Sequence, residues 1–95
     1  MAMPLHEFHP ITAPEIQSVP RAPGIYLLFQ LQLPLCLEQT ENLRRSLVAA
    51  KQEFSRATHF AVEVHQGDQS SLVTRFEQLR SQMGSIRAAG FRGPV

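Results

Sequence analysis

The sequence contains a single cysteine, Cys36, among its 95 residues. One cysteine excludes a disulfide framework within the chain and a zinc site built from several cysteines. Long apolar runs are also lacking: the longest, residues 24–37, is interrupted by two glutamines and a proline and falls short of the ~18–20 residues that span a bilayer. The first residues show neither the basic segment nor the apolar core of a secretory signal. These absences predict a cytoplasmic protein that does not contact a membrane.

Neither sign of charge is in large excess, because the chain has nine basic and eight acidic residues. The distribution is less even, since one arginine accompanies three glutamates up to Glu38, whereas four arginines accompany one glutamate from Thr74 onward. Eight of the nine basic residues are arginine, whose planar guanidinium suits phosphate better than a lysine ammonium does. Length and the 43% hydrophobic content indicate one small globular domain, and the arginines favour nucleic acid as a partner.

Residues 1–23 carry five prolines and no sustained periodicity. Each proline removes a backbone donor and favours an extended predecessor. We therefore expect an N-terminal arm over residues 1–23, laid across a domain that spans residues 24–95. The apolar residues that could fix this arm to the core are Leu5, Phe8, Ile11, Ile16 and Val19.

The domain is expected to follow the order β-β-α-β-α. Residues 24–32 predict a buried strand, a turn around 31–34 follows, and residues 35–37 predict a short second strand. Thr40 is expected to cap a helix over about 41–55. Its apolar stripe is Leu43, Leu47, Ala50 and Phe54.

The alternation of residues 59–65 predicts a third strand, with Ser70 or Ser71 capping a second helix. The apolar stripe of that helix is Leu72, Phe76, Leu79, Met83 and Ile86. The predicted fold is α+β, with a small three-stranded antiparallel sheet and two main helices on one face. The other face would then be free for a protein partner or for homodimerisation, together with the arm.

The segment Pro23-Gly24-Ile25-Tyr26, followed by Gln39-Thr40-Glu41-Asn42-Leu43 at the first helix, resembles the GIY-YIG nuclease superfamily. In that family a Pro-Gly-Ile-Tyr strand pairs with a strand that ends in Tyr-Ile-Gly. The resemblance covers roughly residues 18–90 and includes the order of the elements. It implies a phosphodiesterase dependent on Mg²⁺ or Mn²⁺, in which strand tyrosines activate water, a helix arginine steadies the scissile phosphate and a glutamate on a later helix holds the metal.

The family's site residues can be carried over only in part. Tyr26 matches the first motif tyrosine, and Glu77 matches the metal-binding glutamate. Cys36-Leu37-Glu38 stands in place of Tyr-Ile-Gly, so the second tyrosine is missing. The usual place of the helix arginine falls on Ser46, and the nearest arginines, Arg44 and Arg45, come one or two residues before it. An offset of one or two residues turns a side chain by about 100° or 200° around a helix.

These losses predict a nuclease fold without a competent nuclease site, acting as a nucleic-acid-binding or protein-interaction module without a cofactor. Two alternatives stay open. One is an active Mg²⁺- or Mn²⁺-dependent endonuclease with a rearranged site that uses Tyr26, Glu77 and Arg44 or Arg45. The other is a structural subunit of a larger assembly. The residues expected to contact nucleic acid are Arg21, Arg44, Arg45, Arg80 and Arg87.

Each candidate also has an ordinary structural role. Tyr26 would serve as a core tyrosine, Glu77 as an exposed helix carboxylate, and the arginine pair as part of a solvated helix face. His59, Glu63 and His65 share one face of the third strand and could bind a metal or transfer protons, although a solvent-facing surface is favoured. Cys36 is expected to be a buried, unreactive thiol.

Overall fold

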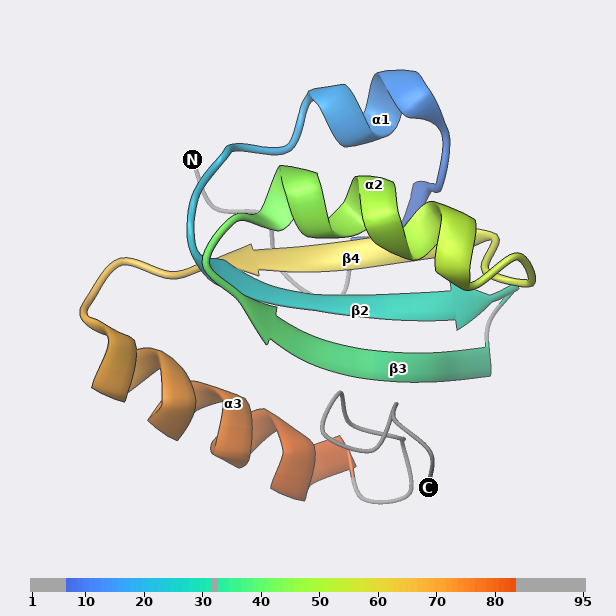
Figure 1. Cartoon of the computed structure of the whole chain (residues 1–95). Helices are drawn as coiled ribbons and strands as arrows, with labels where there is room; N and C mark the ends of the chain where they lie inside the picture. Colours follow the sequence, from blue (N-terminus) through green and yellow to red (C-terminus); the bar gives the residue numbers. More distant parts are fainter. Residues whose placement is uncertain (1–6, 32, 84–95) are drawn as a thin grey trace.

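A four-stranded antiparallel sheet lies at the centre of the structure, with helices on both of its faces (Figure 1). The structure is a computed structural model, and it describes residues 7–31 and 33–83. Its strands are β1 (His9–Pro10), β2 (Gly24–Gln30), β3 (Leu33–Thr40) and β4 (His59–Val64). Its helices are α1 (Ala13–Gln17), α2 (Leu43–Glu53) and α3 (Gln69–Met83). The strands lie in the order β1-β4-β2-β3, and every neighbouring pair is antiparallel.

The predicted α+β class is correct, but the prediction of a three-stranded sheet was wrong, because the N-terminal arm supplies a fourth strand. His9 pairs with Phe60 and Pro10 with His59 at the edge of the sheet. A proline is tolerated there because an edge strand needs hydrogen bonds on one side only. The Ile11 amide then donates to the Thr58 carbonyl at 3.0 Å, which holds the arm against β4.

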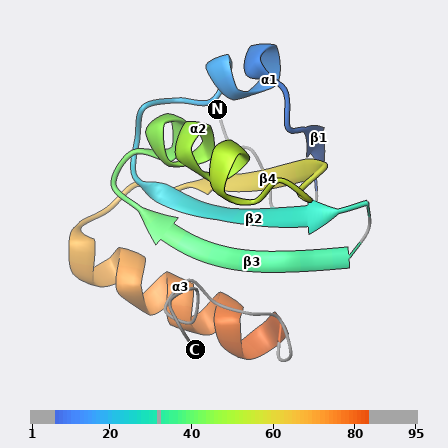
Figure 2. The same ribbon diagram turned by 45° about the vertical axis from the view of Figure 1, so that its right-hand side comes forward.

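The arm also forms α1, a helix that the prolines obscured in the sequence. Pro14 lies in the first turn of α1, where a missing backbone N–H costs nothing because that group has no intrahelical partner. Ile16 and Val19 are buried, as predicted for residues that fix the arm to the core. Figure 2 shows α1 beside α2 on one side of the sheet and α3 on the other.

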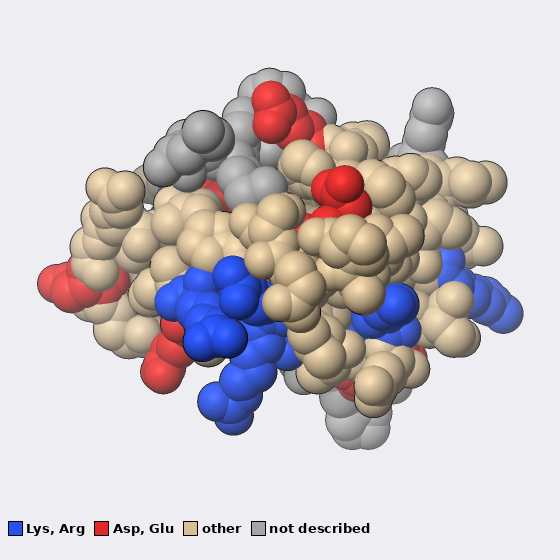
Figure 3. Space-filling model, turned by 90° about the horizontal axis from the view of Figure 1, so that it is seen from above, with Lys and Arg blue, Asp and Glu red and all other residues tan. Residues whose placement is uncertain are grey.

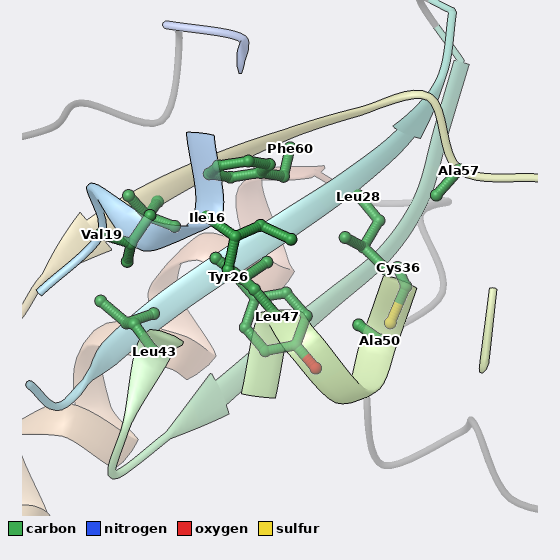
Figure 4. Close-up of a cluster of buried hydrophobic side chains, with 11 residues drawn as sticks. Ile16, Val19, Tyr26, Leu28, Cys36, Leu43, Leu47, Ala50, Ala57 and Phe60 are labelled. Atoms are coloured by element: carbon green, nitrogen blue, oxygen red, sulfur yellow. The ribbon is translucent and has the colours of Figure 1, made fainter. Parts of the chain in front are cut away.

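The central strand β2 is buried on both faces, and this divides the core into two clusters. On the side of the sheet that carries α2, here the α2 side, the buried residues are Ile16, Val19, Tyr26, Leu28, Cys36, Leu43, Leu47, Ala50, Ala57, Phe60 and Val62 (Figure 4). On the α3 side they are Ile25, Leu27, Phe29, Leu37, Ala61, Leu72, Phe76 and Leu79. The prediction that both main helices share one face, leaving the other free for a partner, was therefore wrong, because α3 packs on that second face.

The β2–β3 hairpin is longer than predicted, since β3 begins at Leu33 and continues through Pro34 to Thr40. The register shifts at the step where Leu28 pairs with Cys36 and Phe29 with Pro34. This irregularity and the proline fall on an edge strand, where both are best tolerated. Leu31, at the turn, has a φ of 58°, a left-handed backbone that is rare for a bulky residue.

The two long helices follow the predicted apolar stripes but begin at different residues. Asn42, not Thr40, caps α2, because its side chain accepts a hydrogen bond from the Arg45 amide. Asp68 accepts a bond from the Ser71 amide at 2.8 Å at the start of α3. Ile86 of the predicted second stripe lies outside the described residues. None of the helices in the described part of the chain is long and apolar enough to cross a membrane.

Candidate functional site

Gly24 opens β2 at a point where neither strand nor helix leaves room for a side chain. A Cβ at this position would lie 2.3 Å from the Glu63 carbonyl oxygen of β4 and 2.7 Å from a Leu43 methyl group of α2. The glycine of the Gly-Ile-Tyr segment is thus required by the close approach of β4 and α2 to β2. This requirement is structural, so it accounts for the glycine without any catalytic role.

Tyr26 lies in the core on the α2 side of the sheet, with 2% of its surface exposed (Figure 4). It pairs across the hairpin with Glu38, and its hydroxyl donates a hydrogen bond to the Glu38 carboxylate. Glu38 is the last residue of the segment that replaces Tyr-Ile-Gly. The one tyrosine of the chain is therefore buried and already engaged by a carboxylate.

Three of the predicted nucleic-acid contacts meet at the N-terminal end of α2. Arg44 and Arg45 lie in its first turn, and the Leu43 amide donates to the Ala22 carbonyl at 2.9 Å. That bond brings Arg21 beside the helix start. Arg44 is anchored as well, because its Nε donates to the Val19 carbonyl at 2.8 Å. We call Arg21, Arg44 and Arg45 the α2 arginine cluster.

A surface pocket of about 270 Å³ opens beside this cluster. Its lining consists of Thr40, Glu41, Asn42, Arg45 and Ser46. The Thr40 hydroxyl lies 2.5 Å from the Ser46 hydroxyl and accepts a bond from the Asn42 amide at 3.1 Å. Ser46 occupies the usual place of the family's arginine, and its hydroxyl is thus used to tie α2 to the end of β3.

The remaining predicted site residues lie elsewhere. Glu77 and Arg80 are on α3 and form an ion pair with each other. Arg87 lies outside the described residues. Because Tyr26 faces the α2 side and α3 packs on the opposite face, the structure does not bring Tyr26 and Glu77 together. It likewise separates Arg80 from the α2 arginine cluster.

The divalent ion that the family resemblance implies does not fit the surroundings of Glu77. Its carboxylate is exposed and paired with Arg80. No group of three or more side chains with metal-binding chemistry occurs among residues 7–31 and 33–83. Mg²⁺ is typically held by one or two carboxylates together with waters and substrate phosphates, and the Glu77 carboxylate is already engaged by Arg80. We therefore derive no metal-dependent step for this site.

Charge pairing distinguishes the arginines of the two faces. Arg75 holds Glu63 in a two-pronged ion pair at 2.7 and 2.8 Å, and these hydrogen bonds raise the pKa of Arg75 above its ordinary value. None of the three arginines in the α2 cluster has a carboxylate partner in the part of the chain that the structure describes. Figure 3, viewed onto the α1 and α2 layer, shows one larger patch of Lys and Arg side chains left of the centre and separate, smaller groups to its right.

The histidines and the cysteine occupy separate environments. His59 contacts the Thr58 hydroxyl at 2.9 Å through Nδ1, and His65 contacts the Ser71 hydroxyl at 2.8 Å through Nε2. These two histidines lie at opposite ends of β4, one at its first residue and one just after its last. Cys36 is 1% exposed, which confirms the prediction that it is buried.

Sequence reasoning missed two parts of this site. The bond from Arg44 to Val19 depends on the turn that follows α1, and the sequence offered no periodic signal for that helix. The role of Asn42 as the cap was signalled by its residue type, because asparagine and threonine both favour that position.

Comparison with known proteins assigns no family, since no family model and no curated protein matches the chain.

Proposed function

We propose that this chain is a catalytically degenerate member of the GIY-YIG superfamily that binds nucleic acid through the α2 arginine cluster. The observation that carries the proposal is the meeting of Arg21, Arg44 and Arg45 at one end of α2 without a carboxylate partner among the described residues. Arginine presents a rigid fork of donors that matches phosphate oxygens. Clustered cations of this kind attract the phosphate backbone regardless of sequence.

Binding is favoured over cleavage because the groups that a nuclease would need are apart. The Tyr26 hydroxyl is hydrogen-bonded to Glu38 and lies on the α2 side of the sheet. Glu77 is paired with Arg80 on the α3 side. Residues that act together in catalysis lose most of their effect when one of them is displaced, so a rearranged site with Tyr26 and Glu77 has no geometric support.

Fluorescence anisotropy tests the proposal directly. Labelled duplex, branched and single-stranded DNA and RNA are titrated with the protein at about 50 and 200 mM salt, with Mg²⁺ present. We expect binding that weakens with salt. Arg44→Gln combined with Arg45→Gln should reduce the salt slope by about 1–2, since each lost phosphate contact removes ~0.7–0.9 from it.

The matched control is Arg80→Gln combined with Arg75→Gln, which removes the same charge from the α3 side. It should leave the salt slope near that of the wild-type protein. Absence of binding at 50 mM salt would contradict the proposal and would favour a protein-interaction module or a subunit of an assembly. An equal reduction of the salt slope in the two double variants would show an unspecific effect of net charge and would contradict binding at the α2 arginine cluster. Cleavage of any ligand would restore the endonuclease alternative.

A further inference from the structure

We infer that the α2 arginine cluster binds the terminal phosphomonoester of a nucleic acid strand, not a run of internal phosphodiesters. This inference rests on the proposed function and specifies the group that the cluster recognises. A phosphomonoester carries a charge of about −1.5 to −2 at neutral pH, whereas each internal phosphodiester carries a single negative charge. The distribution of cations on this face discriminates between a compact dianion and an extended chain of single charges.

The cluster is compact because two backbone contacts hold its parts together. The Leu43 amide binds the Ala22 carbonyl at 2.9 Å, and the Arg44 Nε binds the Val19 carbonyl at 2.8 Å. The segment before β2 and the first turn of α2 are thereby fixed side by side. The three arginines are thereby held at the same end of α2, with Arg44 directed toward Val19 and Arg45 beside the pocket.

The cluster is also isolated from the other cations of the same face. Beyond the cluster, the next basic residue of α2 is Lys51, six residues after Arg45 and thus about 9 Å along the helix axis. The intervening exposed positions are Val48 and Ala49, which carry no charge. In Figure 3, uncharged surface separates the larger patch of Lys and Arg side chains from the next Lys or Arg side chains on this face. A backbone track would need cations at the shorter, regular spacing of successive phosphates.

The guanidinium groups are the main donors for recognition, because two of the three backbone amides in the first turn of α2, those of Leu43 and Arg45, already have acceptors. Asn42 accepts the Arg45 amide and Ala22 accepts the Leu43 amide. The Nε bond of Arg44 to Val19 orients its guanidinium and leaves the two terminal nitrogens without a hydrogen-bond partner among the described residues. Two parallel donors held in this way match two oxygens of one phosphate. Glu41 lines the pocket next to Arg45. The negative charge of its carboxylate disfavours the binding of further phosphates on that side.

The experiment compares two forms of one single-stranded 12-mer, labelled at its 3′ end, that differ only in a 5′-phosphate or a 5′-hydroxyl. Anisotropy titrations at pH 8 and about 100 mM salt should give binding of the phosphorylated form about tenfold tighter, as an added charge-assisted pair of hydrogen bonds predicts. Arg44→Gln should reduce this preference to about twofold or less, while Arg80→Gln should retain it. Arg21→Gln and Arg45→Gln, at exposed positions, give the same readout if Arg44→Gln fails to fold.

Equal affinity of wild-type protein for the two oligonucleotides overturns this inference and leaves the proposed function standing as backbone binding. No binding of either form at 50 mM salt overturns both. Competition by a nucleoside 5′-monophosphate with the same affinity as the phosphorylated 12-mer would also overturn it, because the ligand would then be a free nucleotide. A tenfold preference that persists in all three arginine variants would place the phosphate elsewhere and contradict the assignment.

Discussion

Replacement of Gly24 by alanine tests whether this glycine serves packing. No positive φ requires a glycine there, because its backbone lies outside the left-handed region. The obstacle is space: the added Cβ would meet the Glu63 carbonyl oxygen at 2.3 Å and a Leu43 methyl at 2.7 Å, whereas ordinary contacts begin at 3.4 Å. Relief requires β4 and β2 to separate by about 1 Å, and core elements resist such shifts because they are densely packed.

The expected cost is about 2–3 kcal/mol, toward the upper end of the range for overpacked cores, because the nearest atom belongs to the backbone and cannot rotate away. For a domain of this size, 1 kcal/mol corresponds to a change in Tm of roughly 4–8 °C, so the variant should melt about 10–20 °C lower. Thermal unfolding followed by circular dichroism measures this directly. Urea unfolding gives the free energy of unfolding from the midpoint and slope.

Gly67→Ala is the matched control, because it adds the same methyl group beside atoms that can move. Its Cβ would meet the Ser71 hydroxyl at 2.6 Å and the His65 Nε2 at 3.0 Å, which are the ends of rotatable side chains beside the exposed turn that holds Gly67. We expect a change within about 1 kcal/mol, since alanine also restricts the unfolded chain. A Gly24→Ala variant as stable as Gly67→Ala would refute the packing argument.

Three further substitutions follow from the fold. Leu31→Asn should stabilise the protein by about 0.5–1 kcal/mol in urea unfolding, because asparagine tolerates the left-handed backbone better than leucine and the leucine side chain is 68% exposed; a loss of stability would contradict the assigned strain. Leu47→Ala should cost about 2–5 kcal/mol through the cavity it leaves in the α2-side core, and Val48→Ala, at an exposed neighbouring position, should cost nothing measurable. Hydrogen bonds from the Ser71 amide and from the Ser71 and Ser70 hydroxyls lower the pKa of Asp68 below 3.8, so its carboxylate stabilises the fold at neutral pH. That stability should be lost as the pH falls through the lowered pKa, and the difference in Tm between wild-type protein and Asp68→Ala should therefore shrink toward pH 2; a constant difference would contradict this role.

Periodicity predicted the elements of the domain that have a regular pattern. The alternation over β4 and the apolar stripe of α2 led to elements within a few residues of the observed ones. The N-cap of α2 was misplaced by two residues, because threonine and asparagine are both good caps and only the local backbone decides between them. The five prolines of residues 1–23 led to the prediction of an irregular arm. That prediction missed β1 and α1, because proline is also compatible with an edge strand and with the first turn of a helix.

The sequence contained a signal that both faces of the sheet are buried, and the prediction of one free face did not use it. Residues 24–29 are apolar without alternation, which is typical of a strand covered on both sides. The stripe of α3 also needed a face to cover, and only the second face of the sheet remained. The candidate site was harder to predict, because sequence spacing does not say on which face Tyr26 and Glu77 lie. The face on which each residue lies depends on the side of the sheet over which the chain passes between one strand and the next element.

The pairing of β1 with β4 sets the order in which this domain can be completed. His9 finds its partner only at Phe60, so the contact closes a loop of about 50 residues at an entropic cost of roughly 3–4 kcal/mol. On a ribosome, where chains emerge from the N-terminus, the arm must wait until β4 has been made. Amide protons of the arm should consequently exchange with solvent sooner than those of β2. Since the Val19 carbonyl that orients Arg44 belongs to this arm, docking of the arm after β4 has formed also completes the arginine cluster.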